Sequence, residues 1–514
     1  MVMDRRKNLI FGIAVFVFTA AWFSFFAAAR IDLHHDGVML KPAVDVAAGK
    51  VLFRDTFCQY GALSVWMQAL AVKLFGGELI VIQLLTVLFY GGIAVLSDRI
   101  FRRFLSFPFR LVNLALFWGM APFYIVPMHP WSSVYALFFM LLSTEFLLRF
   151  IDREYWSSSA LAGVFAACAF LARHPCGVVS FGAGVLTLAL AAAYLKRKWS
   201  HVGIFAAGSA AVTAPFAVYL LLAGAWNDYL RQCFGFVGGF AWERGGGNWG
   251  EKCSRLFPVL DGLFPNTPID IVYSLLPLVC VAVGLKAFSA LSHCEDAGKR
   301  SRMMGYMTLA LTALASWHQY YPVPCGRHLY WAAIPMFGVF SLACERLWRN
   351  TERKRACRTA AVLLVLSAAL PVAARIAFGM VPFFGNASNF RSCDLPGVRR
   401  MRIMDSDRFV LEGVNDAYAA LAPHIRARGV FNFTPDAMLS VAFPETGFRH
   451  PMFVNWKDEV YRDYPARAME YILVNRPPVI SSEPLDLPGY ESEPRFYGEL
   501  PAQKRSYFFY SPCD

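Results

Sequence analysis

Long apolar stretches with almost no charged residues recur along most of the chain. Eleven of them are predicted to be membrane-spanning helices, since about 20 apolar residues in helical conformation cross the roughly 30 Å hydrocarbon core of a bilayer. They cover residues 9–28, 78–97, 110–127, 133–150, 157–173, 176–195, 201–224, 269–288, 303–317, 328–345 and 359–378. The first follows Arg5, Arg6 and Lys7, as a signal peptide would, but its spanning length favours a retained anchor.

Clusters of basic residues separate these stretches at every second connection. They comprise Arg99, Arg102, Arg103 and Arg110; Arg149 and Arg153; Lys196, Arg197 and Lys198; Lys299, Arg300 and Arg302; and Arg346, Arg349, Arg353, Lys354, Arg355 and Arg358. Cytoplasmic loops carry an excess of Lys and Arg. The N-terminus is therefore expected in the cytoplasm, and segments 29–77, 225–268 and 379–514 outside it.

The outer segments contain most of the polar and turn-forming residues. Within segment 29–77, a helix is expected over 37–48, and residues 62–76 suit a helix lying at the membrane interface. Residues 380–514 have the composition of a soluble domain, with a helical pattern at 414–428 and strand-like runs at 430–433 and 471–474. The expected fold is mainly α: a polytopic membrane helical bundle over residues 1–379, followed by a small extracytoplasmic α/β domain.

Composition and charge narrow the function classes. With 57% hydrophobic and only 17% charged residues, a soluble single domain is excluded. The net charge of +13 is dispersed among the loops, which argues against a nucleic-acid partner. The sequence has no GxxxxGK[ST] loop, no GxGxxG motif that opens a helix and no HExxH motif, so nucleotide-driven chemistry on the inside has no support.

The 12 cysteines are irregularly spaced and form no CxxC pair. Two pairings are open in the outer segments, Cys393 with Cys513 and Cys233 with Cys253, because an oxidising compartment permits disulfides. Each pairing requires Cα atoms within about 7 Å of each other.

Histidines gather at the predicted outer ends of the spans. Six of the ten lie there: His34, His35, His129, His174, His318 and His328. Ionisable groups near membrane depth usually face a polar cavity and mark a substrate path. The alternative is that single histidines anchor helices in the headgroup region, but six together favour a functional site.

Asp36 is the most informative carboxylate, because it lies just past the first span beside His34 and His35. Partial burial there would raise its pKa and suit a general base. The alternative role is an N-cap of the following helix, and the two roles are compatible. Asp55 competes for the role of base, although its neighbour Arg54 favours a structural pair.

Several cationic residues lie on the same side: Arg30, Lys41, Arg54, Arg173 and Arg327. Arg173–His174 and Arg327–His328 each occur where a span meets the outer surface. A guanidinium fork binds phosphate oxygens in pairs, so these positions suit a phosphate group. The alternative is that the long side chains extend to the lipid headgroups.

Four short stretches resemble the first outer loop of the type C (GT-C) integral-membrane glycosyltransferases. They are Asp36-Gly-Val-Met-Leu-Lys-Pro-Ala43, Gly49-Lys-Val-Leu-Phe-Arg-Asp55, Gln59-Tyr-Gly-Ala-Leu63 and Leu74-Phe-Gly76. The family includes protein mannosyltransferases and lipid A aminoarabinose transferase, and its layout of spans is similar. Gly37 stands where the family often has an acidic residue, and Ala62 where it has proline. His129 lies in the loop where many members carry a second carboxylate.

The resemblance implies an inverting glycosyltransferase, for a hexose or pentose, in the plasma (inner) membrane. Its donor would be a polyprenyl-phosphate sugar in the bilayer and its acceptor a glycan, lipid or protein of the cell envelope. Asp36 is the expected catalytic residue. The expected substrate-binding residues are His34, His35, Lys41, Arg54, Asp55, Tyr60, His129, Arg173, His174, Arg327 and His328. No cofactor is certain, and a divalent metal ion is compatible with the site.

The alternative from another class is a transporter or flippase for lipid-linked saccharides that carries out no chemistry. Transporters often show internal repeats and broken helices near the bilayer midplane. The sequence shows no convincing repeat, and its polar residues gather at one face, which favours an enzyme. A sensor whose C-terminal domain binds a ligand would leave Asp36 unexplained.

Overall fold

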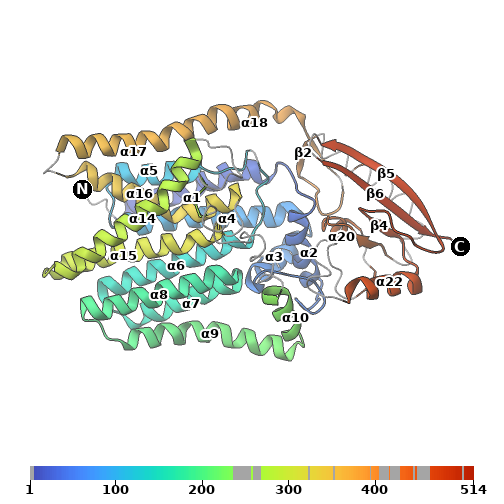
Figure 1. The fold of residues 1–514 in the computed structure, drawn as a ribbon, viewed down its shortest axis with the longest axis horizontal. Coiled ribbons are helices and arrows are strands. Elements are labelled where there is room, and N and C mark those ends of the chain that lie inside the picture. Colours follow the sequence, from blue (N-terminus) through green and yellow to red (C-terminus); the bar gives the residue numbers. More distant parts are fainter. Residues whose placement is uncertain are drawn as a thin grey trace.

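The structure is a computed structural model of the 514-residue chain. It describes residues 5–124, 126–235, 256–258, 268–321, 325–350, 354–393, 395–404, 412, 416, 429–443, 446–448, 463–500 and 503–513. The helices run side by side in a bundle, and the strands lie together beyond one end of it (Figure 1).

Each of the eleven expected spans contains a helix in the described part of the chain. These helices are α1 (Arg5–Ala27), α4 (Leu79–Phe101), α5 (Phe107–Gly119), α6 (Ser132–Arg153), α7 (Trp156–Ala172), α8 (His174–Leu195), α9 (Ser200–Leu222), α14 (Pro268–His293), α15 (Ala297–Ser316), α16 (Gly326–Trp348) and α17 (Lys354–Arg375). Seven of the described helical stretches are long and apolar enough to cross a membrane. The mainly α membrane bundle is confirmed, whereas eleven crossings remain a prediction, since α5 has only 13 residues.

Shorter helices extend or connect these elements. They are α2 (His35–Ala47), α3 (Ala62–Phe75), α10 (Trp226–Leu230), η1 (Arg231–Gly235), η2 (Trp317–Gln319), η3 (Ile376–Met380), α18 (Val381–Gly385), η4 (Ala387–Asn389), α20 (Leu439–Ala442) and α22 (Tyr464–Asn475). The helix α3 leaves Leu70, Leu74 and Phe75 exposed, as suits the interfacial position expected for it. The last long helix continues without a break from α17 to Gly385, past the expected domain boundary.

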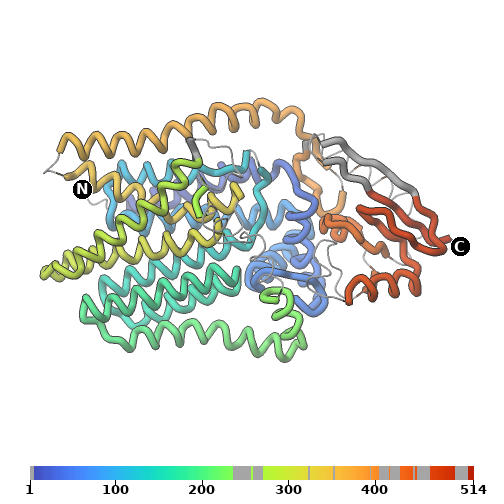
Figure 2. Tube along the Cα trace, in the orientation of Figure 1, coloured from blue at the N-terminus to red at the C-terminus, as the bar shows by residue number. Residues whose placement is uncertain are grey.

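The strands lie in the C-terminal part of the chain, drawn in orange to red in Figure 2. β1 (Phe390–Ser392) pairs antiparallel with β2 (Arg402–Met404). A second sheet has the order β3-β4-β6-β5, with β3 (Phe431–Phe433), β4 (Val479–Ser481), β5 (Tyr490–Leu500) and β6 (Gln503–Pro512). In it β3 and β4 are parallel and the other pairs antiparallel. The α/β character expected for this region is therefore present.

The two strands expected in this region have different outcomes. The strand expected at 430–433 is confirmed by β3, but the one expected at 471–474 is wrong, because these residues belong to α22. In α22, Tyr464, Ala468 and Ile472 are buried at a spacing of four residues, so a helix buries one apolar face against the sheet. The helix expected at 414–428 falls outside the described residues, apart from Asp416.

In the described part of the chain, the expected disulfide between Cys393 and Cys513 is not formed. Cys393 is a buried thiol and Cys513 an exposed one. Cys233 is also a buried thiol, and its Sγ donates to the backbone oxygens of Cys58 and Tyr60, both at 3.7 Å. Cys253 lies outside the described residues.

The C-terminal part contacts the start of α2 directly. The amide of Met438 donates to the backbone oxygen of Leu33 at 2.9 Å. A Cβ atom added to Gly37 would lie 2.1 Å from that amide nitrogen, well inside van der Waals contact. Only glycine therefore fits at position 37, which explains why this chain lacks the acidic side chain that the resembling family often has there.

We expect the substitution Gly37→Ala to destabilise the protein by about 1–3 kcal/mol, because the extra methyl group forces α2 away from residues 437–438. Gly203→Ala is the matched control: this glycine also lies in a helix, and nothing is within 4 Å of its added Cβ. Thermal unfolding in detergent measures both variants. An unchanged midpoint for Gly37→Ala would contradict the tight contact.

Candidate active site

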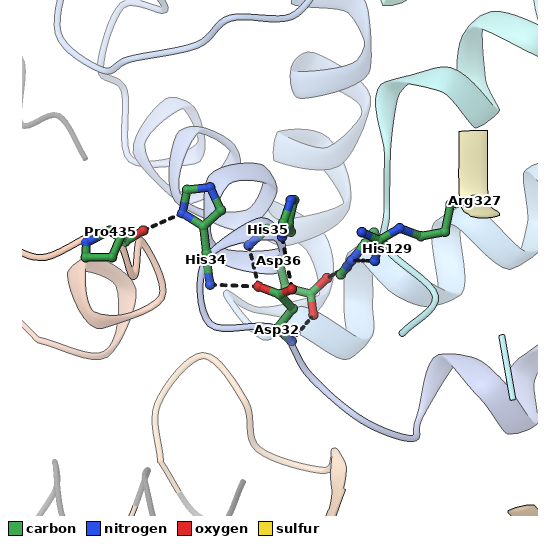
Figure 3. Close-up of polar contacts among 7 residues, drawn as sticks. All are labelled: Asp32, His34, His35, Asp36, His129, Arg327 and Pro435. Atoms are coloured by element: carbon green, nitrogen blue, oxygen red, sulfur yellow. Dashed lines mark hydrogen bonds and ion pairs between the residues drawn. The ribbon is translucent and has the colours of Figure 1, made fainter. Parts of the chain in front are cut away.

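Four segments that are far apart in sequence meet at the end of the bundle next to the strands (Figure 3). The segment between α1 and α2 carries Asp32 and His34, the first turn of α2 carries His35 and Asp36, and the segment between α5 and α6 carries His129. Arg327 lies in the first turn of α16, and Pro435 belongs to the C-terminal part. This cluster, called here the acidic-histidine site, unites several of the residues expected from the sequence.

At its centre, Asp36 and His129 form a fully buried pair. The Nδ1 atom of His129 lies 2.5 Å from Oδ1 of Asp36, and the two side chains are 1% and 0% exposed. The other carboxylate oxygen, Oδ2, accepts a hydrogen bond from the backbone amide of Asp32 at 2.8 Å. Asp36 is thus not an N-cap of α2, because both of its oxygens are engaged elsewhere.

Arg327 fixes the proton on the imidazole of His129. Its guanidinium contacts Nε2 of His129, and a guanidinium can only donate hydrogen bonds. Nε2 is therefore the acceptor, so Nδ1 carries the hydrogen and donates it to Asp36. Burial lowers the pKa of His129, although the charge of Asp36 acts in the opposite direction. A neutral imidazole that donates from Nδ1 to Asp36 and accepts at Nε2 from Arg327 is consistent with all of these contacts.

Asp36 is covered on every side in this state. His34 lies over the start of α2, and its Nδ1 atom is 2.5 Å from the backbone oxygen of Pro435. Because the carboxylate of Asp36 is not exposed, a substrate hydroxyl reaches it only after one of the covering groups has moved.

Asp32 is a second carboxylate of the site, which sequence reasoning did not select. Its Oδ1 accepts from the backbone amides of His34 at 3.0 Å and His35 at 2.8 Å, so it caps the start of α2. Its Oδ2 lies 2.9 Å from Nδ1 of His35. Although burial acts to raise it, the hydrogen bond and charge of His35 hold the pKa of Asp32 well below its usual range. Asp32 is consequently a weak base.

Aromatic and cationic groups form one wall of the site. The rings of Tyr60 and Trp131 are 5.2 Å apart, and His35 stacks on His129 at 5.3 Å. The guanidinium of Arg173 lies 5.8 Å from the centre of the Tyr60 ring. Burial raises the pKa of Tyr60, while the charges of both Arg173 and Arg327 oppose this. The two arginines therefore act on one place from different parts of the chain, Arg173 from between α7 and α8 and Arg327 from α16.

Two buried nitrogen atoms beside this wall have no protein partner in the described part of the chain. They are Nε1 of Trp131, which is a donor, and Nε2 of His318, which is an acceptor because Nδ1 of that ring donates to the backbone oxygen of Ala315. Burial lowers the pKa of His318 to about 4, and the charges of Arg173 and His328 act in the same direction. The ring of His328 lies 5.5 Å from that of Trp331. Trp131 was missed by sequence reasoning, because an interfacial tryptophan carries no specific signal.

The remaining expected residues form separate local pairs. Arg54 binds both carboxylate oxygens of Asp55 at 2.9 Å, and Asp55 also accepts from the amide of Val51. Lys41 donates to Asp45 at 2.6 Å. His174 lies 2.9 Å from the hydroxyl of Tyr229. The structure thus supports the structural reading of Arg54 and Asp55 and places Lys41 and His174 in pairs of their own.

One group of residues has the spacing for a metal ion. The ligand atoms of Asp32, His35 and His129 lie within 4.8 Å of one another. Both ring nitrogens of His129 are already engaged, by Asp36 and by Arg327. A cation bound here would have to displace one of these contacts and lie next to a guanidinium, so the donor set fits a divalent ion poorly.

Comparison with known proteins bears on the fold. No protein-family model and no curated protein matches the sequence. Two solved structures of ArnT from Cupriavidus metallidurans share 12% of residues with it. The form bound to undecaprenyl phosphate superposes with a TM-score of 0.55 over 99% of this chain and 98% of its own. The apo form gives 0.51 over 98% and 97%. The chain therefore has a GT-C-like fold, as the sequence resemblance implies.

Proposed function

We propose that the protein is an inverting glycosyltransferase, which moves a sugar from a polyprenyl-phosphate donor to a cell-envelope acceptor at the outer face of the membrane. The observation that carries the proposal is the series of contacts Asp36–His129–Arg327 near Arg173, in which Asp36 and His129 are fully buried. It places a carboxylate and two guanidinium groups at one end of a GT-C-like fold. The ArnT structure bound to undecaprenyl phosphate supports the choice of lipid.

In the proposed reaction, the acceptor hydroxyl attacks the anomeric carbon of the donor and its proton passes to the carboxylate of Asp36. The bond between that carbon and the phosphate oxygen breaks, and its electrons remain on the polyprenyl phosphate. A single displacement of this kind inverts the anomeric configuration. His129 holds Asp36 in place, since its Nδ1–H is directed at the reacting carboxylate.

The phosphate is the leaving group, so it gains charge as the bond breaks. Arg327 and Arg173 are the residues proposed to stabilise this charge, and preorganised donors of this kind lower a barrier effectively in a buried site. Trp131 offers a buried donor without a protein partner among the described residues. His328 lies in the same turn of α16 as Arg327 and is proposed to contact the donor.

The proposal is tested in proteoliposomes, where cleavage and movement of the lipid are measured separately. The donor is a polyprenyl-phosphate sugar with a labelled sugar. An enzyme releases free polyprenyl phosphate in the presence of acceptor. A transporter or flippase, the alternative, exchanges intact donor between leaflets with the sugar–phosphate bond unbroken. Exchange of intact donor without bond cleavage would reject the enzyme in favour of that alternative.

The proposal also requires a particular orientation: the N-terminus cytoplasmic, and residues 380–514 forming an extracytoplasmic domain beside the site. Reporter fusions after Lys198, after Arg358 and at the C-terminus measure it. We expect the first two in the cytoplasm and the third outside, because the basic connections alternate with the outer segments. A cytoplasmic C-terminal reporter would contradict chemistry at the outer face.

A further inference from the structure

A large basic cavity lies at the opposite end of the bundle from the acidic-histidine site. Its volume is about 1940 Å³, and its walls come from the start of α1, the end of α4, the start of α5, and α15 and α16. A second cavity of about 500 Å³ shares its residues Arg99, Arg102 and Arg103. Neither cavity includes a residue of the acidic-histidine site.

The position of the basic cavity follows from where the helices that line it begin and end. α1 has 23 residues and spans roughly 34 Å, with Arg5 at its start and Asp32 shortly after its end. α16 begins beside the site at Gly326 and reaches Trp348 at the other end. In Figure 1 the N-terminus lies at the end of the bundle away from the strands. The basic cavity is therefore at the end that the sequence assigns to the cytoplasm.

Charge in this cavity is strongly unbalanced. Nine of its lining residues are Arg or Lys and only two are acidic. Both acids are already neutralised inside the protein: Asp98 accepts two hydrogen bonds from Arg110 at 2.8 Å, and Glu345 pairs with Arg349 at 2.5 Å. The acidic groups thus leave most of the positive charge uncompensated.

The uncompensated residues are Arg5, Arg6, Lys7, Arg102 and Arg302. None of them has a carboxylate partner among the described residues, and Arg302 donates instead to the hydroxyl of Tyr306 at 2.9 Å. Partial burial and the positive charge of Arg99 lower the pKa of Arg102. An anion bound in the cavity would relieve this mutual repulsion.

The same cavity has an apolar wall of exposed side chains. Leu9 and Ile13 of α1 and Phe107 of α5 line it and are exposed. Arg110 lies over the rings of Phe11 and Phe107, so the basic and aromatic residues are in direct contact. A ligand with both a negative headgroup and acyl chains matches this surface, whereas a free anion would leave the apolar wall unused.

We propose that the basic cavity binds the phosphate-bearing headgroup of an anionic membrane lipid, whose acyl chains pack against Leu9, Ile13 and Phe107. Basic pockets between membrane helices are suited to such headgroups, and guanidinium groups bind phosphate oxygens in pairs. Orientation of the chain in the membrane requires only positive charge in the loops. That orientation does not require a cavity in which the acidic residues are paired while basic residues are left without a carboxylate partner.

The test uses the full-length protein in nanodiscs with equal amounts of phosphatidylglycerol and phosphatidylcholine, followed by native mass spectrometry of the retained lipid. We expect retention of phosphatidylglycerol to exceed that of phosphatidylcholine roughly tenfold. The double variant Arg102→Gln/Arg302→Gln should lose most of this preference. The matched control Lys196→Gln/Lys198→Gln removes the same charge from exposed residues at the same end, outside both cavities, and should keep it.

Several results would overturn the proposal. Equal retention of the two lipids by the wild-type protein would do so, and this readout does not depend on how well any variant folds. An equal loss of preference in both double variants would show that charge near the membrane acts without a specific site. Displacement of the lipid by millimolar inorganic phosphate would assign the cavity to a free anion instead.

Discussion

Asp36→Asn is expected to reduce single-turnover sugar transfer roughly 10²-fold to 10⁴-fold, the range for loss of a general base. The amide has nearly the shape of the carboxylate but cannot take the proton of the acceptor hydroxyl. It still offers one acceptor oxygen to His129 or to the amide of Asp32, so the fold should persist. Single-turnover transfer and thermal unfolding in detergent would be measured on the same preparation.

Two other carboxylates of the same segment serve as matched controls. Asp55→Asn should retain transfer, because Asp55 binds Arg54 and the amide of Val51. Asp32→Asn should act mainly on stability, since Asp32 caps α2 and its low pKa makes it a poor base. Near-native transfer by Asp36→Asn together with loss in either control would assign the base to the wrong residue.

Arg327→Ala is expected to lower transfer roughly 10²-fold to 10³-fold, as found when a preorganised donor to a developing charge is removed. The change removes the proposed phosphate ligand and also the group that holds Nε2 of His129 as an acceptor. Unlike Asp36→Asn, it should also weaken binding of polyprenyl phosphate. Transfer rate and lipid affinity, measured together, separate the two roles.

Arg197→Ala provides the matched control for loss of an arginine. Arg197 pairs with Glu154 at 2.8 Å at the other end of the bundle, so its removal should leave both transfer and lipid affinity unchanged. Arg327→Lys should restore part of the affinity, because it keeps the charge but not the fork of donors. Full activity in Arg327→Ala would remove Arg327 from the proposed mechanism.

The sequence was sufficient to predict the membrane bundle, because uninterrupted apolar stretches can hardly form anything else in a bilayer. It was less informative in the C-terminal part. Tyr471-Ile-Leu-Val474 is a short apolar run, and such a run does not distinguish a strand from a buried helix. The wider spacing of Tyr464, Ala468 and Ile472, which repeats every four residues, carries the helical signal that decides it.

The site was predictable only as a gathering of residues at one end. Topology brings Asp36, His129 and Arg327 to the same face, although 93 and 198 residues separate the successive partners. No pattern in the sequence shows that they touch, because side-chain contacts between helices depend on rotation and tilt. The capping role of Asp32 could in principle have been predicted from its position just before α2.

The most direct test of the central claim is to incubate the purified protein with a lipid extract that contains polyprenyl-phosphate sugars and envelope acceptors, and to follow every donor by mass spectrometry. The proposed function predicts that the amount of one donor falls while the amount of free polyprenyl phosphate rises equally. It also predicts that Asp36→Asn leaves both amounts unchanged. Consumption of no donor, or equal consumption by wild type and Asp36→Asn, would contradict it.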